Sequence, residues 1–388
     1  MSYVLTKMTD IIEFNPRETI ARKQVCKKVP MEYLQPFTRQ ISGFEEAPYA
    51  GGTKFRNNDT IMARITPCLE NGKTAFVKGF AENEVVFGST EYIVMRAIPG
   101  ASDSVFIYYL ATSPSFRDVA IKSMVGSSGR QRVQQDVLEN LELVLPDYET
   151  QVRVGKVLSA FDDKIELNAQ INHNLEEQLY ALYASNYDNL SGKKVPLKEC
   201  CSFQEGYVNP TQTKPEYFDG SVKWLRAVDI NESFIISTSR TLTEQGFASA
   251  GKSALLFPKD SIAISKSGTI GRLGIVADNM CGNRAVINIV PKQKKWLAFI
   301  YCYLKSRQAE FSDLAVGSVQ KNLYVSILEP LEIFSPADSV LNDFHFSAQT
   351  ILEKMKNNCF EMQSLAQLRD ALLPKLMSGE IDVSEVEV

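Results

Sequence analysis

The sequence predicts an α+β protein built from two copies of one unit, each a β-rich globular domain followed by a long helix. Three observations indicate this. The nine residues LENLELVLP at 138–146 return as LEPLEIFSP at 328–336. The segments around them align at nearly the same offset, and a heptad-spaced apolar pattern follows each copy. One short match could arise by chance, whereas aligned segments in the same order indicate an internal repeat.

The length and composition of the chain suit a globular protein with more than one domain. Its 388 residues exceed the size at which a single hydrophobic core usually stops growing. Hydrophobic residues make up 44% and charged residues 23%, which excludes wholesale disorder. No stretch approaches the roughly 18 consecutive apolar residues of a membrane span. The start, MSYVLTKMTDIIEFN, lacks the pattern of a signal peptide, so we expect a cytoplasmic protein.

The cysteines and histidines do not form a recognisable metal or disulfide pattern. The seven cysteines are odd in number and show no CxxC spacing, so we expect reduced and mostly packed thiols. The two histidines, His173 and His345, fall in expected helices without an HExxH motif or a nearby cysteine pair. We therefore expect no metal and no cofactor.

The repeat extends over most of each half. Before the first long helix the chain reads VGSSGRQRVQQDVLENLELVLP, and before the second VGSVQKNLYVSILEPLEIFSP, with one residue fewer in the loop. Earlier, FRNNDTIMARI resembles FPKDSIAISK, and YVLTKMTDI resembles KVPLKECCS. The sequence thus divides into four parts: a first globular domain (1–147), a central long helix (148–190), a second globular domain (191–335), and a C-terminal long helix and tail (336–388).

Alternating apolar residues predict the strands of each globular domain. The runs are IMARI, EYIVMRA and ELVLP in the first domain and SALLF, SIAIS and AVINIV in the second. Turns rich in Gly, Asn and Pro separate them, and we expect helices near 103–123 and 295–313. The stretch GTIGRLG at 268–274 fits neither GxGxxG nor GxxxxGK[ST], so it is interpreted as a tight turn between two strands.

Each long helix carries residues at the alternating spacing of four and three that is typical of a coiled coil. We call these residues the helix-pair seam. In the first helix they are Phe161, Ile165, Asn168, Asn172, Leu175, Leu179 and Leu182; in the second, 190 positions later, they are Ile351, Met355, Asn358, Met362, Leu365, Arg369 and Leu372. Any two long amphipathic helices can be slid into register, but that alternative does not explain the other aligned segments.

The two helices should pair with each other, because apolar stripes of roughly 55 to 60 Å would otherwise face water. Asn168 and Asn358 hold equivalent seam positions, where a polar residue costs stability but fixes the register. Parallel packing would place both globular domains at one end. Antiparallel packing would place one at each end, related by an approximate two-fold axis. The spacing leaves both arrangements open.

The net charge of −4 conceals an uneven distribution. Residues 191–335 carry 18 Lys and Arg against 13 Asp and Glu, whereas residues 148–190 carry 3 against 7. A DNA-binding protein needs local positive surface rather than a high overall charge. The acidic helices would repel DNA and suit a protein partner.

Basic and polar residues gather in the loops of each copy, and together they predict DNA contacts. Taken singly, each charged residue is more simply a solvated surface side chain. The predicted set is Arg64, Thr66, Lys73, Ser127, Arg130, Gln131 and Arg132 in the first domain, and Lys266, Ser267, Thr269, Arg272, Arg284, Ser318, Gln320, Lys321 and Asn322 in the second.

The chain shows no constellation of catalytic residues. The NPRE at 15–18 lacks the aromatic residue of an amino-methyltransferase motif, and GxSxG is absent. No pair of carboxylates stands out from the acidic surface residues. We interpret the chain as a binding module rather than an enzyme.

In its whole length the chain resembles the specificity subunit of type I restriction-modification systems. The resemblance rests on the doubled order of domain and helix, the GS-containing loops, the two LExLExxxP strands, and the PDYETQ stretch that leads into the first helix. It implies that each globular part is a target recognition domain that reads one half of a bipartite site in double-stranded DNA.

The resemblance also implies that the helices pack as an antiparallel coiled coil, act as a ruler, and dock two methyltransferase (modification) subunits. Motor-endonuclease (restriction) subunits then join that complex. Two departures are visible. The second copy has SPADSV where the first has LPDYETQ, so the entry into the second helix should differ. Lys321 and Asn322 replace Gln131 and Arg132, so the two domains should read different half-sites.

Two other functions compete with this interpretation. A self-sufficient enzyme fused to a DNA reader would need a catalytic domain, for which no sequence remains. A coiled-coil scaffold that binds only proteins, without DNA specificity, would show no salt-sensitive association of either globular domain with DNA.

Overall fold

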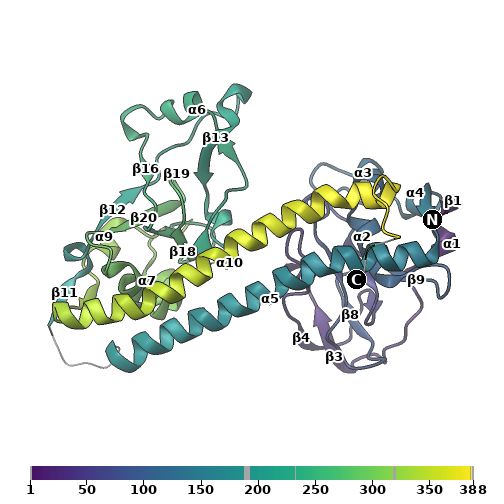
Figure 1. The fold of residues 1–388 in the computed structure, drawn as a ribbon, viewed down its shortest axis with the longest axis horizontal. Coiled ribbons are helices and arrows are strands. Elements are labelled where there is room, and N and C mark those ends of the chain that lie inside the picture. Colours follow the sequence, from purple (N-terminus) through teal and green to yellow (C-terminus); the bar gives the residue numbers. More distant parts are fainter. Residues whose placement is uncertain (1, 188–192, 232, 318–319, 385, 387–388) are drawn as a thin grey trace. The chain divides into compact units, whose positions relative to one another are not determined.

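The computed structural model describes residues 2–187, 193–231, 233–317, 320–384 and 386. The chain forms two compact units (Figure 1). The first unit combines Met1–Ile165 with Ser364–Val388, and the second unit is Glu166–Gln363. Among the described residues, no helix combines the length and apolar character needed to cross a membrane.

The first unit contains three sheets. One is antiparallel, in the order β2 (Ile12–Phe14), β9 (Tyr92–Ala97), β6 (Thr60–Ala63), β7 (Thr74–Phe76). The second has the order β4 (Glu45–Pro48), β3 (Val25–Val29), β8 (Val86–Gly88), β5 (Lys54–Phe55), with β3 and β8 parallel. A ribbon pairs β1 (Tyr3–Lys7) with β10 (Glu142–Pro146). The short helices are α1 (Met8–Ile11), η1 (Met31–Tyr33), α2 (Ser104–Thr112), α3 (Pro114–Lys122) and α4 (Gln135–Glu139).

The second unit repeats this strand order. One sheet runs β12 (Cys201–Glu205), β20 (Val286–Pro291), β17 (Ile262–Ser265), β18 (Leu273–Val276), with β14 (Phe234–Ile235) added at its edge. The other runs β15 (Thr241–Leu242), β13 (Phe218–Leu225), β19 (Met280–Gly282), β16 (Leu256–Phe257), with β13 and β19 parallel. The ribbon is β11 (Lys194–Pro196) with β21 (Glu332–Phe334). The expected mixture of strands and helices in two similar globular parts is confirmed.

Among the described residues, the second unit has more short helices than the first. Its short helices are η2 (Leu197–Glu199), η3 (Pro215–Tyr217), η4 (Ala227–Asp229), α6 (Glu244–Ala248), η5 (Gly251–Ser253), α7 (Trp296–Ser306), η6 (Gln308–Glu310), α8 (Phe311–Leu314) and α9 (Val325–Leu328).

The main core of the first unit lies between the β2-β9-β6-β7 sheet, α2 and the long helices. Residues Phe106–Ala111 of α2 are almost fully buried, and Leu158 of α5 and Leu376 of α10 belong to the same cluster. Burying a side chain such as Phe106 contributes roughly 1.5 to 3 kcal/mol. The globular part and the long helices of this unit therefore share one core.

The helices expected near 103–123 are confirmed as α2 and α3. Pro114 separates them, because it forces Ser113 into an extended conformation and begins α3 as its first residue. The strand expected at SALLF was wrong in extent: it is limited to Leu256–Phe257, because the run begins at Ser253, the last residue of η5. The turn interpretation of GTIGRLG is confirmed, with Gly268 and Gly271 at positive φ between β17 and β18.

The long helices are α5 (Tyr148–Tyr187) and α10 (Asp338–Ser378). In the second unit they lie side by side (Figure 1) and run in opposite directions. Asn168 donates to Glu361 at 2.8 Å, whereas Asn172, one turn later on α5, donates to the carbonyl of Met355, which lies earlier on α10. In the first unit the two helices are joined by a buried ion pair between Asp162 and Arg369.

The two long helices begin differently, as the sequence predicted. Asp147 caps α5: its carboxylate accepts from the backbone N–H of Thr150 at 3.0 Å. The equivalent residue before α10 is Ala337, which has no side chain acceptor and contributes only its carbonyl to Leu341.

Candidate nucleic-acid interface

In the first unit, main-chain hydrogen bonds bring four of the predicted residues together at the end of β6. The carbonyl of Arg64 accepts from the N–H of Val133 at 2.8 Å, and the N–H of Thr66 donates to the carbonyl of Gln131 at 3.0 Å. Arg132 exchanges two backbone hydrogen bonds with Val125, at 2.9 and 3.0 Å. The loop that contains GSSGRQR is therefore attached directly to the end of β6.

A carboxylate that the sequence analysis did not single out lies at the centre of this group. Glu91 accepts from Arg132, whose Nε is 3.0 Å from both carboxylate oxygens and whose Nη2 is 2.6 Å from Oε1. The Nε of Arg64 is 4.0 Å from the other oxygen. The hydrogen bonds from Arg132 lower the pKa of Glu91, against an opposing effect of burial. Glu91 therefore stays ionised at neutral pH.

Two buried polar atoms at this site have no hydrogen-bond partner among the described residues. They are Nε of Arg64 and Oγ1 of Thr66. Leaving such an atom unsatisfied costs roughly 1 to 3 kcal/mol, so each one in a folded protein calls for an explanation. Both atoms are buried, so a ligand does not reach them in this conformation.

The tip of the loop extends into solvent. Ser127 and Arg130 are exposed, and the N–H of Arg130 closes a turn on the carbonyl of Ser127 at 2.9 Å. Gly126 and Gly129 adopt positive φ values of 135° and 77°, which the turn requires and which other residues rarely adopt. These two polar side chains are available to a ligand.

The second unit has the same backbone arrangement at the end of β17. The carbonyl of Lys266 accepts from the N–H of Leu323 at 2.9 Å, and Val316 and Asn322 exchange two hydrogen bonds of 2.9 Å. Lys266 and Leu323 thus stand where Arg64 and Val133 stand in the first unit.

The side chains around Lys266 differ from those around Arg64. Its ammonium lies 3.1 Å from Glu205 and 4.9 Å from the ring centroid of Tyr324. Glu205 also accepts from the hydroxyl of Tyr207. Burial raises the pKa of Glu205, but the hydrogen bonds from Tyr207 and Lys266 outweigh it, so the pKa is lowered overall. Glu205 comes from the end of β12, whereas Glu91 directly precedes β9.

The other predicted residues of the second unit fall into three places. Ser267, Thr269 and Arg272 lie in the turn between β17 and β18, where Arg272 donates to Asn231 at 2.8 Å. Gln320 and Lys321 are exposed in the loop beside Asn322. Ser318 lies outside the described residues.

Arg284 is exposed, and its backbone N–H donates to Asn209 at 3.4 Å. The Nδ2 atom of Asn209 is a further buried group without a partner among the described residues. Lys73 is held inside the first unit, because its ammonium donates to the carbonyl of Met31 at 2.8 Å. Lys73 is thus not gathered with the side chains around Glu91.

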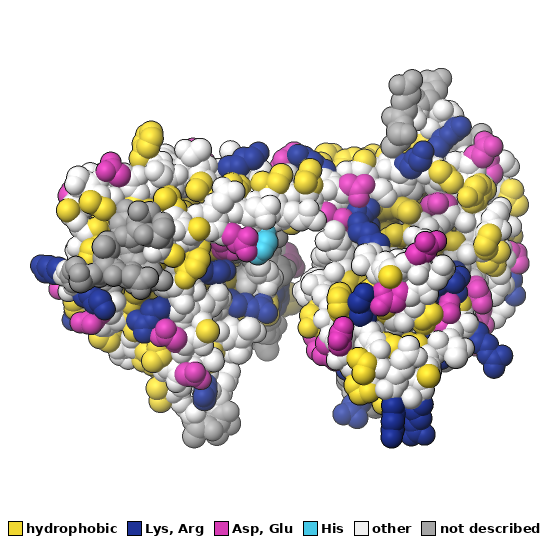
Figure 2. Space-filling model, turned by 90° about the horizontal axis from the view of Figure 1, so that it is seen from below, with side chains coloured by type: hydrophobic (Ala, Val, Ile, Leu, Met, Phe, Trp, Pro, Cys, Tyr) yellow, Lys and Arg dark blue, Asp and Glu magenta, His cyan; other side chains and the backbone are white. Residues whose placement is uncertain are grey.

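The surface charge is mixed in both units. Figure 2 shows Lys and Arg side chains interspersed with Asp and Glu on the visible face. Several basic residues near the start of the chain are neutralised by ion pairs, such as Lys27 with Glu84 at 2.9 Å and Lys28 with Glu45 at 2.7 Å. The loop residues Arg130 and Lys321 have no ion pair with another described residue.

Most seam residues are at least partly buried. Asn168, Leu179, Met355, Asn358 and Met362 are buried, and the half-buried ones are Phe161, Ile165, Leu175, Leu182, Ile351, Leu365 and Leu372. Asp162, next to the seam residue Phe161, was not expected inside the pair. Its burial is explained by the ion pair with Arg369 and by a 2.6 Å hydrogen bond from Tyr109.

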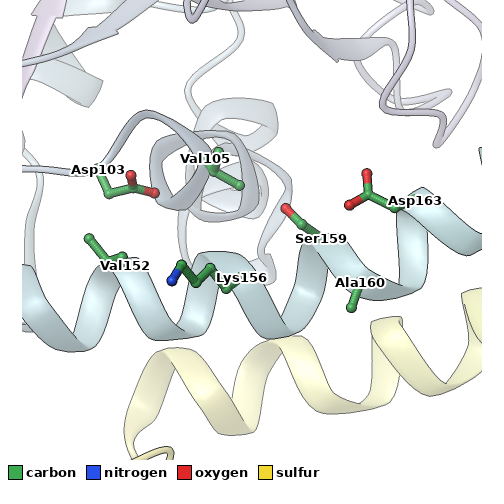
Figure 3. Close-up of a pocket in the computed structure, with 7 residues that line it drawn as sticks. All are labelled: Asp103, Val105, Val152, Lys156, Ser159, Ala160 and Asp163. Carbon is green, nitrogen blue, oxygen red and sulfur yellow. The ribbon is translucent and has the colours of Figure 1, made fainter. Parts of the chain in front are cut away.

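A groove of about 460 Å³ lies in the first unit between the start of α2 and α5. Figure 3 shows Lys156, Ser159 and Asp163 of α5 along one side and Asp103 and Val105 on the other. Gly155 allows this close approach, since a Cβ there would lie 3.0 Å from the carboxylate of Asp103. Within the described residues, no cluster of His, Cys, Asp and Glu could hold a metal ion.

Comparison with known proteins decides the family. The family model described as the type I restriction modification DNA specificity domain matches twice, at residues 3–177 and 192–360. The chain belongs to this family. It is 24% identical over 421 residues to the type I restriction enzyme HindI specificity subunit of Haemophilus influenzae, covering 88% of this chain and 90% of the relative. Its function is therefore DNA sequence recognition within a type I restriction-modification system, without catalysis of its own.

Two further comparisons agree with that membership. The type I restriction enzyme MjaIX specificity subunit of Methanocaldococcus jannaschii is 27% identical over 308 residues, covering 73% of this chain and 70% of the relative. The crystal structure of the type I restriction-modification system S subunit from M. genitalium has a TM-score of 0.53 at 15% identity, covering 97% of this chain and 96% of that one. The latter likeness concerns the fold alone.

Proposed function

We propose that each unit of this specificity-family member reads one half of a bipartite site in double-stranded DNA, through the loop attached to the end of β6 or β17. The observation that carries the proposal is the exposed loop that main-chain hydrogen bonds attach to the end of β6, beside the partly exposed guanidinium of Arg132. Donors at the end of a strand, next to an exposed Gly-Ser-Arg loop, suit phosphate oxygens and base edges.

The two units read different half-sites. Support comes from the side chains that surround equivalent backbone positions: Arg64, Glu91 and Arg132 in the first unit, and Lys266, Glu205 and Tyr324 in the second. Arginine presents a planar fork of donors, whereas lysine presents a compact point charge. Groups of such different geometry select different base edges.

The paired helices form an antiparallel coiled coil that relates the two target recognition domains by a pseudo-two-fold axis. Their length sets the length of the spacer, the stretch of DNA between the two half-sites that neither domain reads. The domains proposed are 1–147 and 191–335, each followed by its helix. At 1.5 Å per residue, the 40 residues of α5 correspond to roughly 60 Å, enough to address major-groove segments on nearby turns of a duplex. The opposed direction of the helices in the second unit and the buried Asn172–Asn358 contact support this role.

Two methyltransferase subunits dock on the helices, and restriction subunits join the complex indirectly, in the cytoplasm where the DNA is. Both long helices expose apolar residues that a partner would cover, including Leu167, Leu368 and Phe346, which is 81% exposed. The groove beside Lys156 and Ala160 offers a further contact on α5 (Figure 3).

One experiment tests the whole proposal. The chain is expressed with its candidate methyltransferase, and modified bases are mapped across the host genome. We expect methylation at a single motif made of two specific half-sites and a spacer of constant length. Methylation at a continuous site, or at a motif with a variable spacer, would contradict the proposed arrangement. An absence of salt-sensitive association of either globular domain with DNA would instead favour the protein-only scaffold.

A further inference from the structure

The guanidinium of Arg132 is held in one orientation by Glu91. Its Nε and Nη2 atoms face the carboxylate, with three contacts between 2.6 and 3.0 Å. The backbone of Arg132 is fixed as well, through its two hydrogen bonds with Val125. The rotation of this long side chain is thus restricted before any ligand binds, which lowers the entropy cost of binding.

The opposite edge of the same guanidinium is open. Across the described part of the chain, Nη1 of Arg132 has no hydrogen-bond partner, and the side chain is 45% exposed. Arginine has five N–H donors in a planar fork, so the edge formed by Nη1 and the second hydrogen of Nη2 still presents two parallel donors. Glu91 therefore selects which pair of donors faces outward.

Glu91 also reduces the value of Arg132 as a phosphate anchor. A carboxylate at hydrogen-bond distance offsets the positive charge of Arg132 and would repel a nearby phosphate, so Arg132 is a weak phosphate-binding residue. The fixed orientation of its guanidinium instead suits recognition of a group with a defined arrangement of acceptors. Among the base edges of the major groove, guanine offers two adjacent acceptors, O6 and N7, that match two parallel donors.

We propose that Arg132 reads a guanine in the half-site of the first unit through its open edge, and that Glu91 is the positioning residue that aims it. This inference depends on the proposed function, since it names the base that one of the two DNA-reading loops selects. Arg64 completes the group, with its unpartnered Nε 4.0 Å from the same carboxylate.

The second unit lacks this arrangement and supplies an internal control. The residue at the position of Arg132 is Asn322, which exchanges the same pair of backbone hydrogen bonds with Val316. The nearby cation is Lys266, at the position of Arg64, which donates to Glu205 and lies over the ring of Tyr324. Asn322 has no guanidinium fork, and Arg132 and Glu91 belong to the first unit, so changes to either should leave the half-site of the second unit unaltered.

The test uses the complete methyltransferase complex with wild-type or variant chain. The motif is first mapped for the wild type, and binding is then measured on duplexes in which each motif guanine is replaced by 7-deazaguanine, which lacks the N7 acceptor. Arg132→Lys keeps the charge but removes the fork, and Glu91→Gln keeps the side chain size but removes the charge that holds Arg132. Arg153→Lys is the matched control, because Arg153 lies on α5 and outside the set of predicted DNA contacts.

For Arg132→Lys we expect one guanine position, in one half-site only, to become degenerate in the methylation map, with a loss of discrimination of roughly 5- to 150-fold. 7-Deazaguanine at that position should weaken binding of the wild type but not of Arg132→Lys. Glu91→Gln should lose part of the same discrimination, and Arg153→Lys none.

Three results would overturn the inference while leaving the proposed function intact. The first is a bipartite wild-type motif without a G·C pair. The second is an Arg132→Lys motif identical to that of the wild type. The third is a uniform loss of affinity in Arg132→Lys with unchanged base preference, which would indicate a phosphate contact. A wild-type chain that directs no sequence-specific methylation would instead refute the proposed function itself.

Discussion

Asn358 donates a hydrogen bond of 2.8 Å to the side chain oxygen of Asn172, and both residues are buried between α5 and α10 in the second unit. Asn172 in turn donates to the carbonyl of Met355 at 3.0 Å. A buried amide pair of this kind stabilises less than an apolar pair would, but it penalises every other register of the two helices.

The first prediction concerns this amide pair. Asn358→Leu leaves the oxygen of Asn172 without its donor, so we expect the free energy of unfolding to fall by about 1 to 3 kcal/mol. The double variant Asn172→Leu with Asn358→Leu should cost less than the sum of the two single changes, because no polar group remains unpaired. Urea denaturation of the four proteins measures this; additive effects would show that the amides do not interact energetically.

A second prediction concerns the ion pair between Asp162 and Arg369 in the first unit. Both side chains are buried, and Tyr109 donates to the second oxygen of Asp162 at 2.6 Å. Arg369→Met should destabilise the protein by roughly 3 to 5 kcal/mol, since it leaves a buried carboxylate without a cation. Adding Asp162→Asn should recover part of that loss in thermal unfolding. If the single and double variants melt at the same temperature, the pairing contributes nothing.

The third prediction is a pH dependence at the start of α5. Hydrogen bonds from the Thr150 side chain, then from the backbone N–H groups of Ser2 and Thr150, lower the pKa of Asp147 to about 2. Its pKa in the unfolded chain is about 4. Because the folded pKa is the lower one, the stabilisation is fully present above pH 4 and is lost as the pH falls towards 2.

Asp147→Ala should therefore reduce stability by about 1 kcal/mol at pH 7 and by progressively less below pH 4. Denaturation of both proteins at pH 7 and across the acid range checks this. A difference that grows as the pH falls would contradict the assigned direction. Ala337, which precedes α10, offers the converse change, since Ala337→Asp should add a cap.

The fourth prediction follows from the proposed ruler. Inserting four residues in the middle of one long helix adds roughly 6 Å of rise, so we expect the preferred spacer to lengthen by about one to two base pairs. Mapping methylated sites before and after the insertion measures the spacer. Four conservative substitutions at exposed positions of α10 serve as the control. An unchanged spacer would contradict the ruler.

The fifth prediction concerns two exposed loop cations. Alanine at Arg130 or Lys321 should weaken DNA binding and reduce the slope of log K against log salt by roughly 0.9 for each lost phosphate contact. Lys354→Ala is a matched control, because Lys354 is an exposed lysine on α10 rather than in a loop. Fluorescence anisotropy measures the DNA affinity of each protein at several salt concentrations. Equal slopes for the wild type and the variants would show that Arg130 and Lys321 contact no phosphate.

Local pattern predicted the parts of this fold that depend on neighbouring residues. Alternation placed β6, β9, β10, β17 and β20 within one or two residues, and the heptad spacing indicated the long helices, because both periods report directly which side chains face a core. The echo between 138–146 and 328–336 indicated the duplication, and both units have the same core strand order.

The pattern did not predict groups that arise from distant segments. Glu91 is one of many acidic residues in the sequence, and only the return of the loop at Arg132 gives it a partner 41 positions away. Asp162 follows a seam residue directly in the sequence, where a charged residue is normally exposed to solvent. Its burial depends on the ion pair with Arg369, 207 positions later. The parallel pairing of β3 with β8 likewise depends on contacts that alternation does not encode.

The attachment of the loops to the ends of β6 and β17 depends on the amide of Val133 or Leu323 and the carbonyl of Arg64 or Lys266, and every residue except proline has both groups. The side chains at the loop can therefore be exchanged while the scaffold stays the same. If the loop reads DNA as proposed, a library randomised at positions 127, 130 and 132 should remain largely folded while its members diverge in the sequences at which they direct methylation.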